Sequence, residues 1–517
     1  MHGNKPTSHI CSQKKKNPLK YSLIDMASFL TYSLSLMKLL VFSSLLLILV
    51  SCFVKTSNAF EGRKDWTSAI GSHFHTVEIS SLLPASVCTT SSIKGTSNKR
   101  QSTLEFYHRH GPCSRLGQDK ANPTTIPSLS EILVNNEFHV KSIQARVNPN
   151  SNTNQLKNQK ANLPVQSGLS LGTGNYIVTI GLGTPKKTLS FAFDTASDLT
   201  WTQCEPCAGS CYKQQDPIFN PSTSTTYCNV SCKSSECSQL FSATGNKPGC
   251  TSSSACIYEI LYADQSFSVG FFSGDKLTIA RDEFPNFLFG CGQDNEGLFG
   301  ETAGILALGR HPISLISQTA QKYGKYFSYC LPSTPSQTGH LTLGKNGVPC
   351  NVKFTPFDNS QGPSFYFINI LSITVGGHQL PIEQSVFKTS GCIIDSGTVI
   401  TRLPPAAYAT MRIEFRKQMS KYKIAPAFEI LDTCYDLSGY TTITIPVISF
   451  TFSVNVKVNL APFGILVAVS ATTACLAFAP NWDVSDVAIF GNTQHKTFEV
   501  IYDVAGGKLG FGPDACQ

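Results

Sequence analysis

Two aspartates in the sequence each end a run of apolar residues and enter a short turn of hydroxyl and small residues. Asp194 lies in FAFDTASDLTW, and Asp395 lies in CIIDSGTVITR. Two carboxylates held about 3 Å apart cannot both ionise, so they share one proton at acidic pH. The ionised carboxylate can act as a general base on a water molecule, while the protonated one polarises a carbonyl group. The two aspartates are therefore candidates for a catalytic pair.

One such motif alone is weak evidence, because an aspartate at the end of a strand often forms only an Asx turn. Here the whole plan repeats. Each half carries a later apolar run that ends in a small residue, AGILALGR in the first half and VAIFGNTQ in the second. The aspartates are 201 residues apart, which leaves about one lobe of chain for each. The repeat predicts two β-lobes related by internal duplication, each contributing one aspartate.

The elements that must position the aspartates are short strands. NYIVTIGLG, LSFAFD, CIYEILYAD and TFEVIYDV alternate apolar and polar residues, and clusters of Gly, Pro, Ser and Asn separate such runs. This pattern is typical of a mainly β protein. Helical stretches are few, and the strongest is PPAAYATMRIEFRKQMSKY, which has prolines in its first turn.

The beginning of the chain differs from the rest in charge. Residues 1–160 hold 19 Lys and Arg against 8 Asp and Glu, whereas residues 161–517 hold 22 against 25. The apolar run 39–54, followed by KTSNAF, is typical of a secretory signal peptide. We assign residues 1–59 to it, with Met26 as an alternative start. The run has 16 residues, fewer than the ~18 of a membrane span, so a stable span is not expected and an uncleaved signal anchor is the alternative.

Residues 60–162 are expected to form a removable pro-segment and linker. The stretch SLSEILVNNEFHVKSIQARV predicts an amphipathic helix with Ser130 as its cap. Four apolar residues would line one side of this helix: Ile132, Leu133, Phe138 and Ile143. NPNSNTNQLKNQKAN, which follows, is a polar linker of the kind that proteases cut. Removal of this segment also removes the positive charge, so no nucleic-acid partner is expected for the mature part.

The cysteines agree with a secretory route. Of 19 cysteines, 15 follow residue 161, and eight lie between Cys204 and Cys256. Secreted chains use such density for disulfides. No histidine pair at ligand spacing accompanies the CEPCAGSC run. Disulfides are therefore favoured over zinc, and no metal is expected.

With these motifs together, residues 161–517 resemble a pepsin-type (A1) aspartic endopeptidase of the plant nepenthesin-like branch. The resemblance rests on the duplicated motif, the cysteine-rich insert after its first copy, and the segments FGCG, FSYCLP and YDVAGGKLGFGPDAC. It implies a bilobal pepsin-like fold, with residues 163–340 as the N-terminal lobe and 341–517 as the C-terminal lobe. It also implies a monomeric, cofactor-free endopeptidase that hydrolyses protein or peptide substrates at acidic pH, either in the extracellular space (apoplast) or in the vacuole.

The resemblance assigns roles around the catalytic dyad of Asp194 and Asp395. Five neighbours would support the two loops: Thr195, Ser197, Ser396, Gly397 and Thr398. Of these, the residue after each aspartate would hydrogen-bond across the lobe interface, and Ser197 and Thr398 would each hold the outer oxygen of the adjacent carboxylate. Tyr262 in YADQS would be the flap tyrosine that closes over substrate, with Trp201 packed behind it.

The same resemblance implies six disulfides: Cys204–Cys207, Cys211–Cys291, Cys232–Cys256, Cys237–Cys250, Cys330–Cys516 and Cys434–Cys475. Three cysteines remain without a partner in this pattern: Cys228, Cys350 and Cys392. Of these, Cys392 is expected to be a packed thiol on a buried strand. Asn229 begins an Asn-Val-Ser sequon and is a candidate for glycosylation.

The first half departs from the family pattern at three glycines. Ala196 replaces the glycine of Asp-Thr-Gly, Ala263 that of the flap Tyr-Gly-Asp, and Ala307 that of the companion apolar element. The second half keeps Gly397 and Gly491. A left-handed backbone at Ala196 would cost about 1–2 kcal/mol. With a negative φ, its methyl group would instead occupy space near the dyad. An active or attenuated peptidase is favoured over an inactive one.

Two other functions compete with this interpretation. The first is a catalytically silent, peptidase-like binding or inhibitor protein of the plant extracellular space, which the alanines favour and the retained aspartates oppose. The second is a DNA-binding protein of plastids. The charge distribution opposes it, as does a leader that is apolar rather than rich in Arg and Ser.

Overall fold

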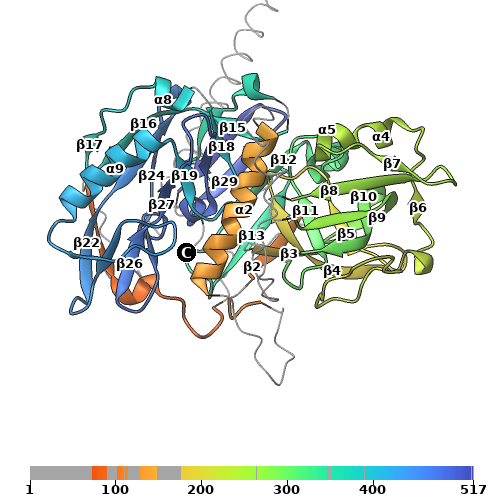
Figure 1. Cartoon of the computed structure of the whole chain (residues 1–517), viewed down its shortest axis with the longest axis horizontal. Helices are drawn as coiled ribbons and strands as arrows, with labels where there is room; N and C mark the ends of the chain where they lie inside the picture. Colours follow the sequence, from red (N-terminus) through yellow and green to blue (C-terminus); the bar gives the residue numbers. More distant parts are fainter. Residues whose placement is uncertain are drawn as a thin grey trace, which may run out of the picture. The chain divides into compact units, whose positions relative to one another are not determined.

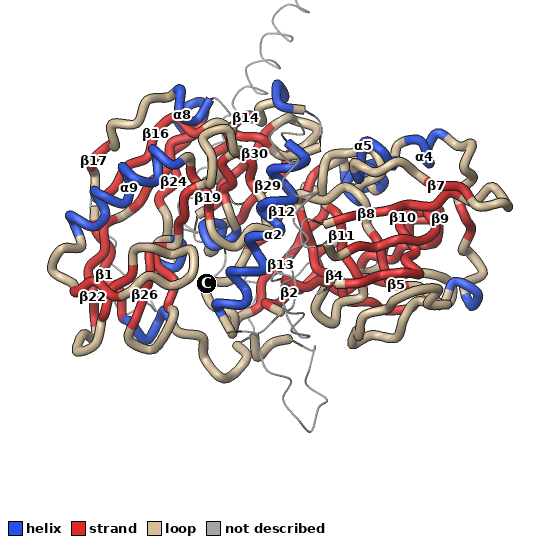
Figure 2. The backbone as a smooth tube through the Cα atoms, viewed as in Figure 1, coloured by secondary structure: helices blue, strands red, loops and turns tan. Residues whose placement is uncertain are grey.

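Strands dominate the structure, as the alternating pattern predicted, and they form two β-lobes (Figures 1 and 2). The computed structural model describes residues 73–89, 102–109, 111–114, 128–147, 176–262, 265–297, 299–345, 349, 351–362, 364–388, 391–513 and 515. The expected signal peptide lies outside these residues. Among the residues that are described, no helix has the length and apolar character needed to cross a membrane.

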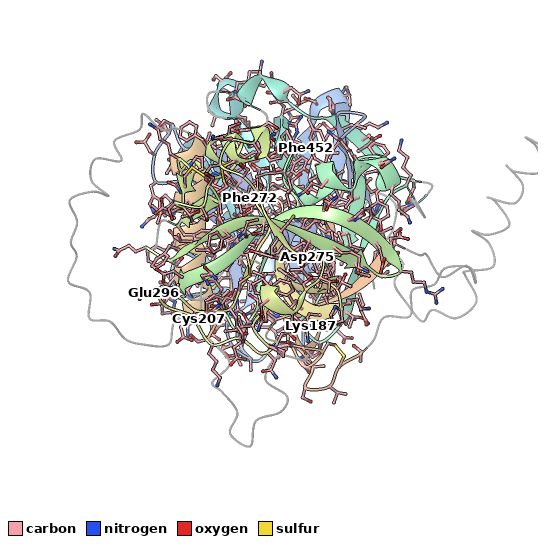
Figure 3. All side chains as sticks on the ribbon, turned by 90° about the vertical axis from the view of Figure 1, so that its right-hand side faces the viewer. Lys187, Cys207, Phe272, Asp275, Glu296 and Phe452 are labelled. Atoms are coloured by element: carbon pink, nitrogen blue, oxygen red, sulfur yellow. A yellow bond between two sulfur atoms is a disulfide. The ribbon has the colours of Figure 1, made fainter. Side chains whose placement is uncertain are left out.

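The largest sheet has 15 strands and contains strands from both halves of the chain. In spatial order they are β14 (Lys353–Pro356), β30 (Lys508–Gly512), β29 (Glu499–Asp503), β12 (Tyr326–Cys330), β13 (Thr338–Leu343), β2 (Thr103–His108), β3 (Tyr176–Leu182), β4 (Lys187–Asp194), β11 (Gly304–Ala307), β5 (Trp201–Gln203), β10 (Asp282–Glu296), β9 (Phe267–Ile279), β8 (Cys256–Leu261) and β7 (Gly249–Cys250), with β6 (Cys228–Asn229) beside β9. Phe272 and Asp275 are buried on β9, and Figure 3 shows both among the strands of the first lobe.

The other sheets are smaller and are built mainly from the second half. One has the order β15 (Phe367–Ile368), β18 (Cys392–Ile394), β28 (Ala488–Phe490), β19 (Thr401–Leu403), β27 (Phe478–Pro480). The next has β17 (His378–Gln379), β16 (Ile370–Val375), β23 (Ile448–Phe452), β24 (Val456–Asn459), and a further one has β20 (Lys423–Ala425), β21 (Cys434–Asp436), β26 (Thr473–Leu476), β25 (Leu466–Ala468). In the last, β1 (Phe74–Glu78) pairs with β22 (Thr442–Pro446).

The described helices are α2 (Leu129–Val147), α4 (Ser235–Ser238), α5 (Leu240–Thr244), α6 (Leu315–Gln318), α7 (Ala320–Tyr323), α8 (Ser385–Lys388) and α9 (Pro405–Gln418). The helix α9 begins at a proline, as its sequence predicted. Figure 1 shows α2, in orange, between the strands of the two lobes.

The duplication is visible in how the strands around each aspartate pair. In the first half, β4 pairs in parallel with β11, and β11 pairs antiparallel with β5. In the second half, β18 pairs in parallel with β28, and β28 pairs antiparallel with β19. One continuous hydrophobic core includes residues of both copies, among them Phe193 and Phe490. The two aspartate loops therefore rest on equivalent frameworks.

The helix α2 has the predicted extent and buries Leu133 and Ile143 of the predicted face, but its cap differs from the prediction and its buried face is more polar. Ser128, not Ser130, caps it: the Ser128 Oγ accepts from the Glu131 N–H at 3.2 Å, and Glu131 accepts in return from the Ser128 N–H at 2.6 Å. This reciprocal pair is a capping box, which the spacing Ser-x-x-Glu favours. Phe138 is only half-buried, and the buried face instead includes Asn136, His139 and Gln144 beside Leu133, Val140 and Ile143.

In the cysteine-rich region, four of the expected disulfide pairs differ from those in the structure. Cys204 is bonded to Cys291, and Cys207 to Cys211. The pairs Cys204–Cys207 and Cys211–Cys291 are therefore wrong. The reason is tertiary: β5 and β10 are parallel neighbours, which places Cys291 opposite Thr202 and beside Cys204.

The second correction follows from burial. Cys237 is bonded to Cys256, and Cys232 to Cys250, so the expected pairs Cys232–Cys256 and Cys237–Cys250 are wrong. Cys237 and Cys256 are both buried, whereas Cys250 is exposed and Cys232 is half-buried. Each disulfide thus joins cysteines of similar depth.

The remaining cysteines divide into bonded and free thiols. The expected Cys434–Cys475 disulfide is present. Cys330 is disulfide-bonded, while its expected partner Cys516 lies outside the described residues, as does Cys350. Cys228 is free and exposed, and Cys392 is free and buried on β18. A further disulfide, Cys88–Cys113, lies wholly in the segment before residue 162 and was not anticipated.

Candidate active site

The strands bring the two aspartate loops into contact with each other. Asp194 is the last residue of β4, and Asp395 follows β18 directly. Both are almost completely buried, with 2% and 0% of their surface exposed. The Ala196 N–H donates to Asp194 Oδ1 at 3.0 Å, and the Gly397 N–H donates to Asp395 Oδ1 at the same 3.0 Å. The two loops therefore fold alike around their carboxylates.

Hydroxyl side chains join the two loops to each other. The Thr195 N–H donates to Ser396 Oγ at 3.1 Å, and the Ser396 N–H donates to Thr195 Oγ1 at 2.9 Å. Thr195 Oγ1 also donates to Asp395 Oδ1 at 3.2 Å. These reciprocal bonds hold one loop against the other, so displacement of either aspartate would break contacts to both.

A second pair of hydroxyls holds the outer carboxylate oxygens. Ser197 Oγ donates to Asp194 Oδ2, and Thr398 Oγ1 donates to Asp395 Oδ2 at 2.7 Å. The expected supporting residues therefore all lie at the two carboxylates. What this geometry offers is a pair of fixed, buried carboxylates.

The alanines of the first half fit without backbone strain. Neither Ala196 nor Ala307 has a positive φ, so the left-handed alternative for Ala196 does not apply. Ala307 pairs with Asp194 across β11 and β4, and its N–H donates to Thr200 Oγ1 at 3.0 Å. The corresponding glycine of the second half, Gly491, donates likewise to Thr401 Oγ1 at 2.8 Å. Ala263 lies outside the described residues.

The second loop has no room for the same methyl group. A Cβ built at Gly397 would lie 2.8 Å from Asp194 Oδ1 and 2.7 Å from His139 Nε2. Contacts under 3.0 Å require something to shift. The site is thus asymmetric: the first loop carries a methyl at this position, and the second needs a glycine.

The expected flap tyrosine and its tryptophan are in contact. Trp201 Nε1 donates to the Tyr262 hydroxyl at 3.1 Å, and Trp201 is fully buried. Phe299 lies edge-on to both rings, at 4.8 Å from Trp201 and 5.5 Å from Tyr262 between ring centroids. Tyr262 is therefore positioned by a packed aromatic group as well as by the hydrogen bond.

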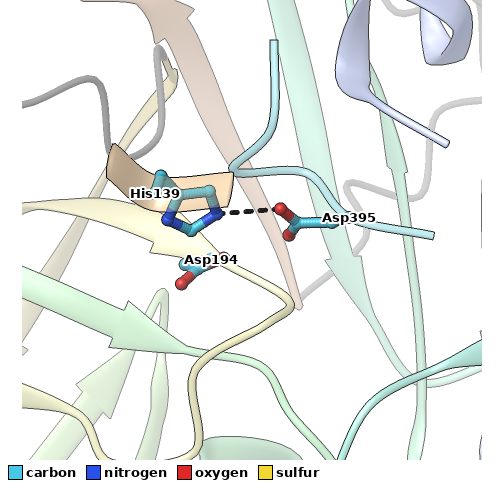
Figure 4. A group of neighbouring side chains, drawn as sticks. All are labelled: His139, Asp194 and Asp395. Carbon is cyan, nitrogen blue, oxygen red and sulfur yellow. Dashed lines mark hydrogen bonds and ion pairs between the residues drawn. The ribbon is translucent and has the colours of Figure 1, made fainter. Parts of the chain in front are cut away.

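A histidine from α2 occupies the space in front of the dyad (Figure 4). His139 Nε2 lies 2.9 Å from Asp395 Oδ2, and only 6% of the His139 surface is exposed. The ligand atoms of His139, Asp194 and Asp395 lie within 4.8 Å of one another, so these three could in principle hold a metal ion. The short contact between His139 and Asp395 already pairs the imidazole with a carboxylate.

Other polar residues of α2 clamp both aspartate loops. Asn136 Nδ2 donates to the Gly397 carbonyl at 3.1 Å, and Asn136 Oδ1 accepts from the Val399 N–H at 3.0 Å. Arg146 Nη1 donates to the Ala196 carbonyl at 2.8 Å, and its Nη2 lies 3.6 Å from Asp198 Oδ2. The helix therefore contacts the loop of each lobe and covers the dyad.

Apolar residues of α2 fill the surface beside the dyad. Val140 and Ile143 belong to a hydrophobic cluster that includes Ala196, Phe365 and Ile489. Leu133 belongs to another, with Val399 and Leu431. The helix thus combines polar contacts at the carboxylates with apolar contacts on either side of them.

Burial and the contact with His139 push the ionisation of the two aspartates apart. Burial raises the pKa of Asp194 to about 6, and the charge of Asp395 adds to this rise. Burial acts in the same direction on Asp395, but the charge and hydrogen bond of His139 outweigh it and hold the pKa of that carboxyl well below its usual range. Burial would lower the pKa of His139, and Asp395 more than offsets this and raises it. Below pH 6 the favoured state is neutral Asp194, ionised Asp395 and protonated His139.

The sequence predicted that Asp194, Asp395 and their five supporting neighbours lie together, but it did not point to His139 and Asn136. The helical spacing contains a usable signal: Asn136, His139, Ile143 and Arg146 follow one another at three- and four-residue intervals and so share one face. Polar residues on a face that also carries buried apolar residues indicate a polar partner. The sequence did not reveal which residues form that partner, because they are more than 250 residues away; Asp395, for instance, is 256 residues from His139.

Comparison with known proteins agrees with this geometry. The family models described as xylanase inhibitor N-terminal and xylanase inhibitor C-terminal match residues 176–345 and 365–513. An aspartyl protease family protein of Arabidopsis thaliana is 52% identical over 446 residues, which covers 86% of this chain and 93% of the relative. The aspartic proteinase nepenthesin-2 of Nepenthes gracilis is 36% identical over 363 residues, covering 68% and 80%.

Solved structures share the fold at lower identity. Edgp matches with a TM-score of 0.55 at 19% identity, covering 68% of this chain and 93% of that one. The basic 7S globulin from soybean matches with a TM-score of 0.53 at 20% identity, covering 65% and 92%. With two lobes, two aspartate loops of equivalent geometry and these relatives, the chain belongs to the plant A1 aspartyl protease family.

Proposed function

We propose that this protein is an aspartic endopeptidase that cleaves peptide bonds at acidic pH. The observation that carries the proposal is the complete hydrogen-bond network that fixes Asp194 and Asp395, with Ala196 and Gly397 making the same 3.0 Å contact to their carboxylates. The alanine in the first loop has therefore not disrupted the hydrogen bonds to the Asp194 carboxylate. In the proposed reaction the dyad shares one proton.

The chemistry requires only the carboxylates and water. The ionised carboxylate accepts a proton from water, which attacks the peptide carbonyl, while the protonated carboxyl donates a hydrogen bond to the carbonyl oxygen. The tetrahedral intermediate then collapses as the leaving amine takes up a proton. Burial raises the pKa of Asp194 to about 6 in the presence of α2, which makes it the proton holder in this form. Once His139 is removed, the two groups titrate as a pair.

We further propose that the chain is synthesised as an inactive precursor. Residues 1–59 would direct it into the secretory pathway, and residues 60–162 would be the pro-segment, with α2 as its inhibitory part. His139 stands where a catalytic water must reach Asp395, and Asn136 and Arg146 hold the helix on both loops. The disulfides support an oxidising compartment such as the apoplast or vacuole. A plastid location is the alternative.

The test is cleavage of a denatured protein substrate by the purified precursor between pH 3 and 7, with and without pepstatin. The expected result is pepstatin-sensitive cleavage in acid that is preceded by loss of the segment containing α2. Asp395→Asn should abolish it, while Asp483→Asn, the same change at an exposed aspartate outside the two aspartate loops, serves as the matched control. Cleavage that persists in Asp395→Asn would refute the assignment. Sequencing of the new N-terminus in secreted material tests the processing and the compartment together.

A second candidate function is a peptidase-like binding or inhibitor protein without activity. The observations that favour it are Ala196 and Ala307 beside the first aspartate, and the xylanase inhibitor description of both matching family models. It predicts that the form lacking α2 binds a peptide without cutting it, and that Ala196→Gly with Ala307→Gly restores cleavage.

A further inference from the structure

The segment before residue 148 contains two parts that are held to the rest of the protein in different ways. The first, which we call the strand module, consists of residues 73–114, of which 73–89, 102–109 and 111–114 are described. The second is α2. Residues 115–127, which connect the two, lie outside the described residues.

The strand module is built into the sheets of the protein. Strand β2 lies between β13 and β3 in the largest sheet and pairs antiparallel with both. Five residues of β2 face β13, Thr103 to Tyr107 opposite Thr342 to Thr338. Strand β1 pairs with β22 over a further five residues. If the module left, β13 and β3 would each lose a row of backbone hydrogen bonds in the middle of a sheet.

Side chains of the module reach into the common core. Phe106 is fully buried and lies 5.3 Å from Phe193 and 5.5 Å from Tyr176 between ring centroids. Phe193 directly precedes Asp194 in the sequence. Arg109 is 6% exposed and packs so tightly against Gly300 that a Cβ there would lie 0.4 Å from Arg109 Nη2. The module therefore supports the strand that carries the first aspartate.

A disulfide joins the two strand-containing parts of the module to each other. Cys88 is bonded to Cys113, which links the chain after β1 to the turn after β2. On either side of Cys88, the Thr89 N–H donates to the Ser336 carbonyl at 2.8 Å, and the Ala85 N–H donates to Ser336 Oγ at 3.2 Å. A cut between residues 90 and 101 would thus leave both halves of the module covalently joined.

The contacts of α2 with the body are made by its side chains, through apolar contacts, hydrogen bonds and charged pairs. Its contacts with the body include three charged pairs: His139–Asp395, Arg146–Asp198 and Glu137–Arg402. It contributes no strand to a sheet, and none of the described disulfides includes a residue of it. These pairs are largely buried, so salt screens them only in part. Acidification below pH 6 also neutralises Asp198, whose pKa burial raises to about 6, and so weakens its pair with Arg146. Neither condition removes backbone ladders, buried ring contacts or disulfides.

We propose that the strand module stays bound to the body as a second, non-covalent chain after the sequence is cut on both sides of α2, and that only α2 leaves. That the chain is cut at these places in nature is part of the proposed function. The retention of the module does not depend on natural cutting. The partner surface is the slot between β13 and β3 together with the free edge of β22, and its occupant is residues 73–114 of the same chain. The active protein is then a two-chain molecule.

The experiment uses an inactive full-length protein, Asp194→Asn, so that self-cleavage plays no part while Asp395 keeps its contact with His139. Recognition sequences for an unrelated site-specific protease are inserted between residues 114 and 128 and between 147 and 176. After cutting, the protein is diluted into high salt at pH 4 without reductant and separated by size-exclusion chromatography. Intact-mass analysis then identifies the chains in each peak.

The expected result is a peak that contains the body and the strand module in equal amounts, with the α2 peptide eluting separately. Phe106→Ala should release at least half of the module under the same conditions, and Cys88→Ala with Cys113→Ala should hasten its loss. Recovery of the folded body alone, with the module eluting with the small peptides, would overturn the proposal. Retention of α2 together with the module would equally contradict the division into two parts.

Because the test protein lacks catalytic activity by design, failure of retention and failure of the peptidase assignment are separate outcomes. An active enzyme that loses the module refutes only the present proposal. If the unmutated protein stays inactive after α2 has been cut away but keeps the module, only the peptidase assignment is refuted.

Discussion

At the scale of single residues, the two aspartate loops differ at the position two residues after the aspartate, where Ala196 has a methyl group and Gly397 has none. The structure shows in which loop this methyl group is tolerated. Ala196 keeps a negative φ and a 3.0 Å bond from its N–H to Asp194 Oδ1. A methyl at Gly397 would stand 2.8 Å from Asp194 Oδ1. The deviation of the first half from the family pattern is therefore compatible with a formed dyad, whereas the mirror-image change in the second half is not.

This asymmetry gives a matched pair of variants. Ala196→Gly should change kcat/KM by less than about threefold, because it removes a methyl that the loop already accommodates and leaves the carboxylate bonds in place. Gly397→Ala should lower kcat/KM by about 100-fold, since a misplacement of about 1 Å costs this much. Steady-state kinetics on one peptide substrate, with thermal unfolding to confirm that both variants fold, measures the two effects. A rise of 100-fold in Ala196→Gly would show instead that the natural alanine suppresses activity.

At the scale of elements, α2 shows what a sequence can and cannot reveal about a helix. Its extent followed from the 3.6-residue periodicity of its apolar residues. Its cap did not: Ser130 was expected, whereas a local Ser-x-x-Glu box makes Ser128 the cap. Its buried polar face did not follow, because Asn136 and His139 find their partners in a loop of the other half of the chain. The predicted disulfides of the cysteine-rich region were wrong for the same reason, because strand pairing rather than sequence spacing decides which cysteines meet.

The charges under α2 predict a bell-shaped pH dependence of its binding. Burial raises the pKa of Asp198 to about 6, and Arg146 opposes the rise, so Arg146 favours the ionised form. This contribution is present above pH 6 and is lost as the pH falls through that value. Asp395 raises the pKa of His139 above 6.5 against the effect of burial, so that pair is complete below pH 6.5 and is lost as the pH rises through the raised pKa. The affinity of α2 should peak between the two.

A peptide of residues 128–147 and an Asp194→Asn body cut free of α2 provide the measurement, because this body keeps Asp395 and Asp198 while the Asp194 titration is removed. Calorimetric affinities from pH 4 to 9 should fall severalfold on each side of the maximum. Arg146→Gln in the peptide should remove the acidic fall alone, and His139→Gln the alkaline fall alone. Identical profiles for all three peptides would contradict the assignment of the two pairs.

At the scale of the whole molecule, the two-lobed architecture was predictable because the aspartate motif and its later apolar run occur in both halves of the sequence. Each copy supplies a strand, an aspartate turn and a parallel partner strand, and the hydrogen bonds exchanged by Thr195 and Ser396 join the copies face to face. The insertion of β2 between β13 and β3 had no such internal signature. TLEFYH indicates a strand, but its residues do not predict which strands it pairs with. Its two neighbours, β13 and β3, lie on either side of it in space and are far apart in the sequence.

The disulfides of the first lobe extend the argument from local geometry to the stability of the whole fold. Cys204 and Cys291 close 87 residues of chain, whereas Cys207 and Cys211 close only 4. If a disulfide acts mainly by restricting the unfolded chain, the first should contribute about 4–5 kcal/mol to the free energy of unfolding and the second about 2 kcal/mol. Chemical unfolding of the Ala–Ala variant of each pair, followed by fluorescence of Trp201 in the same lobe, compares them directly. The long-range variant should unfold at the lower denaturant concentration. The reverse order would mean that packing around the buried Cys204 and Cys291, rather than loop closure, sets the stability of this lobe.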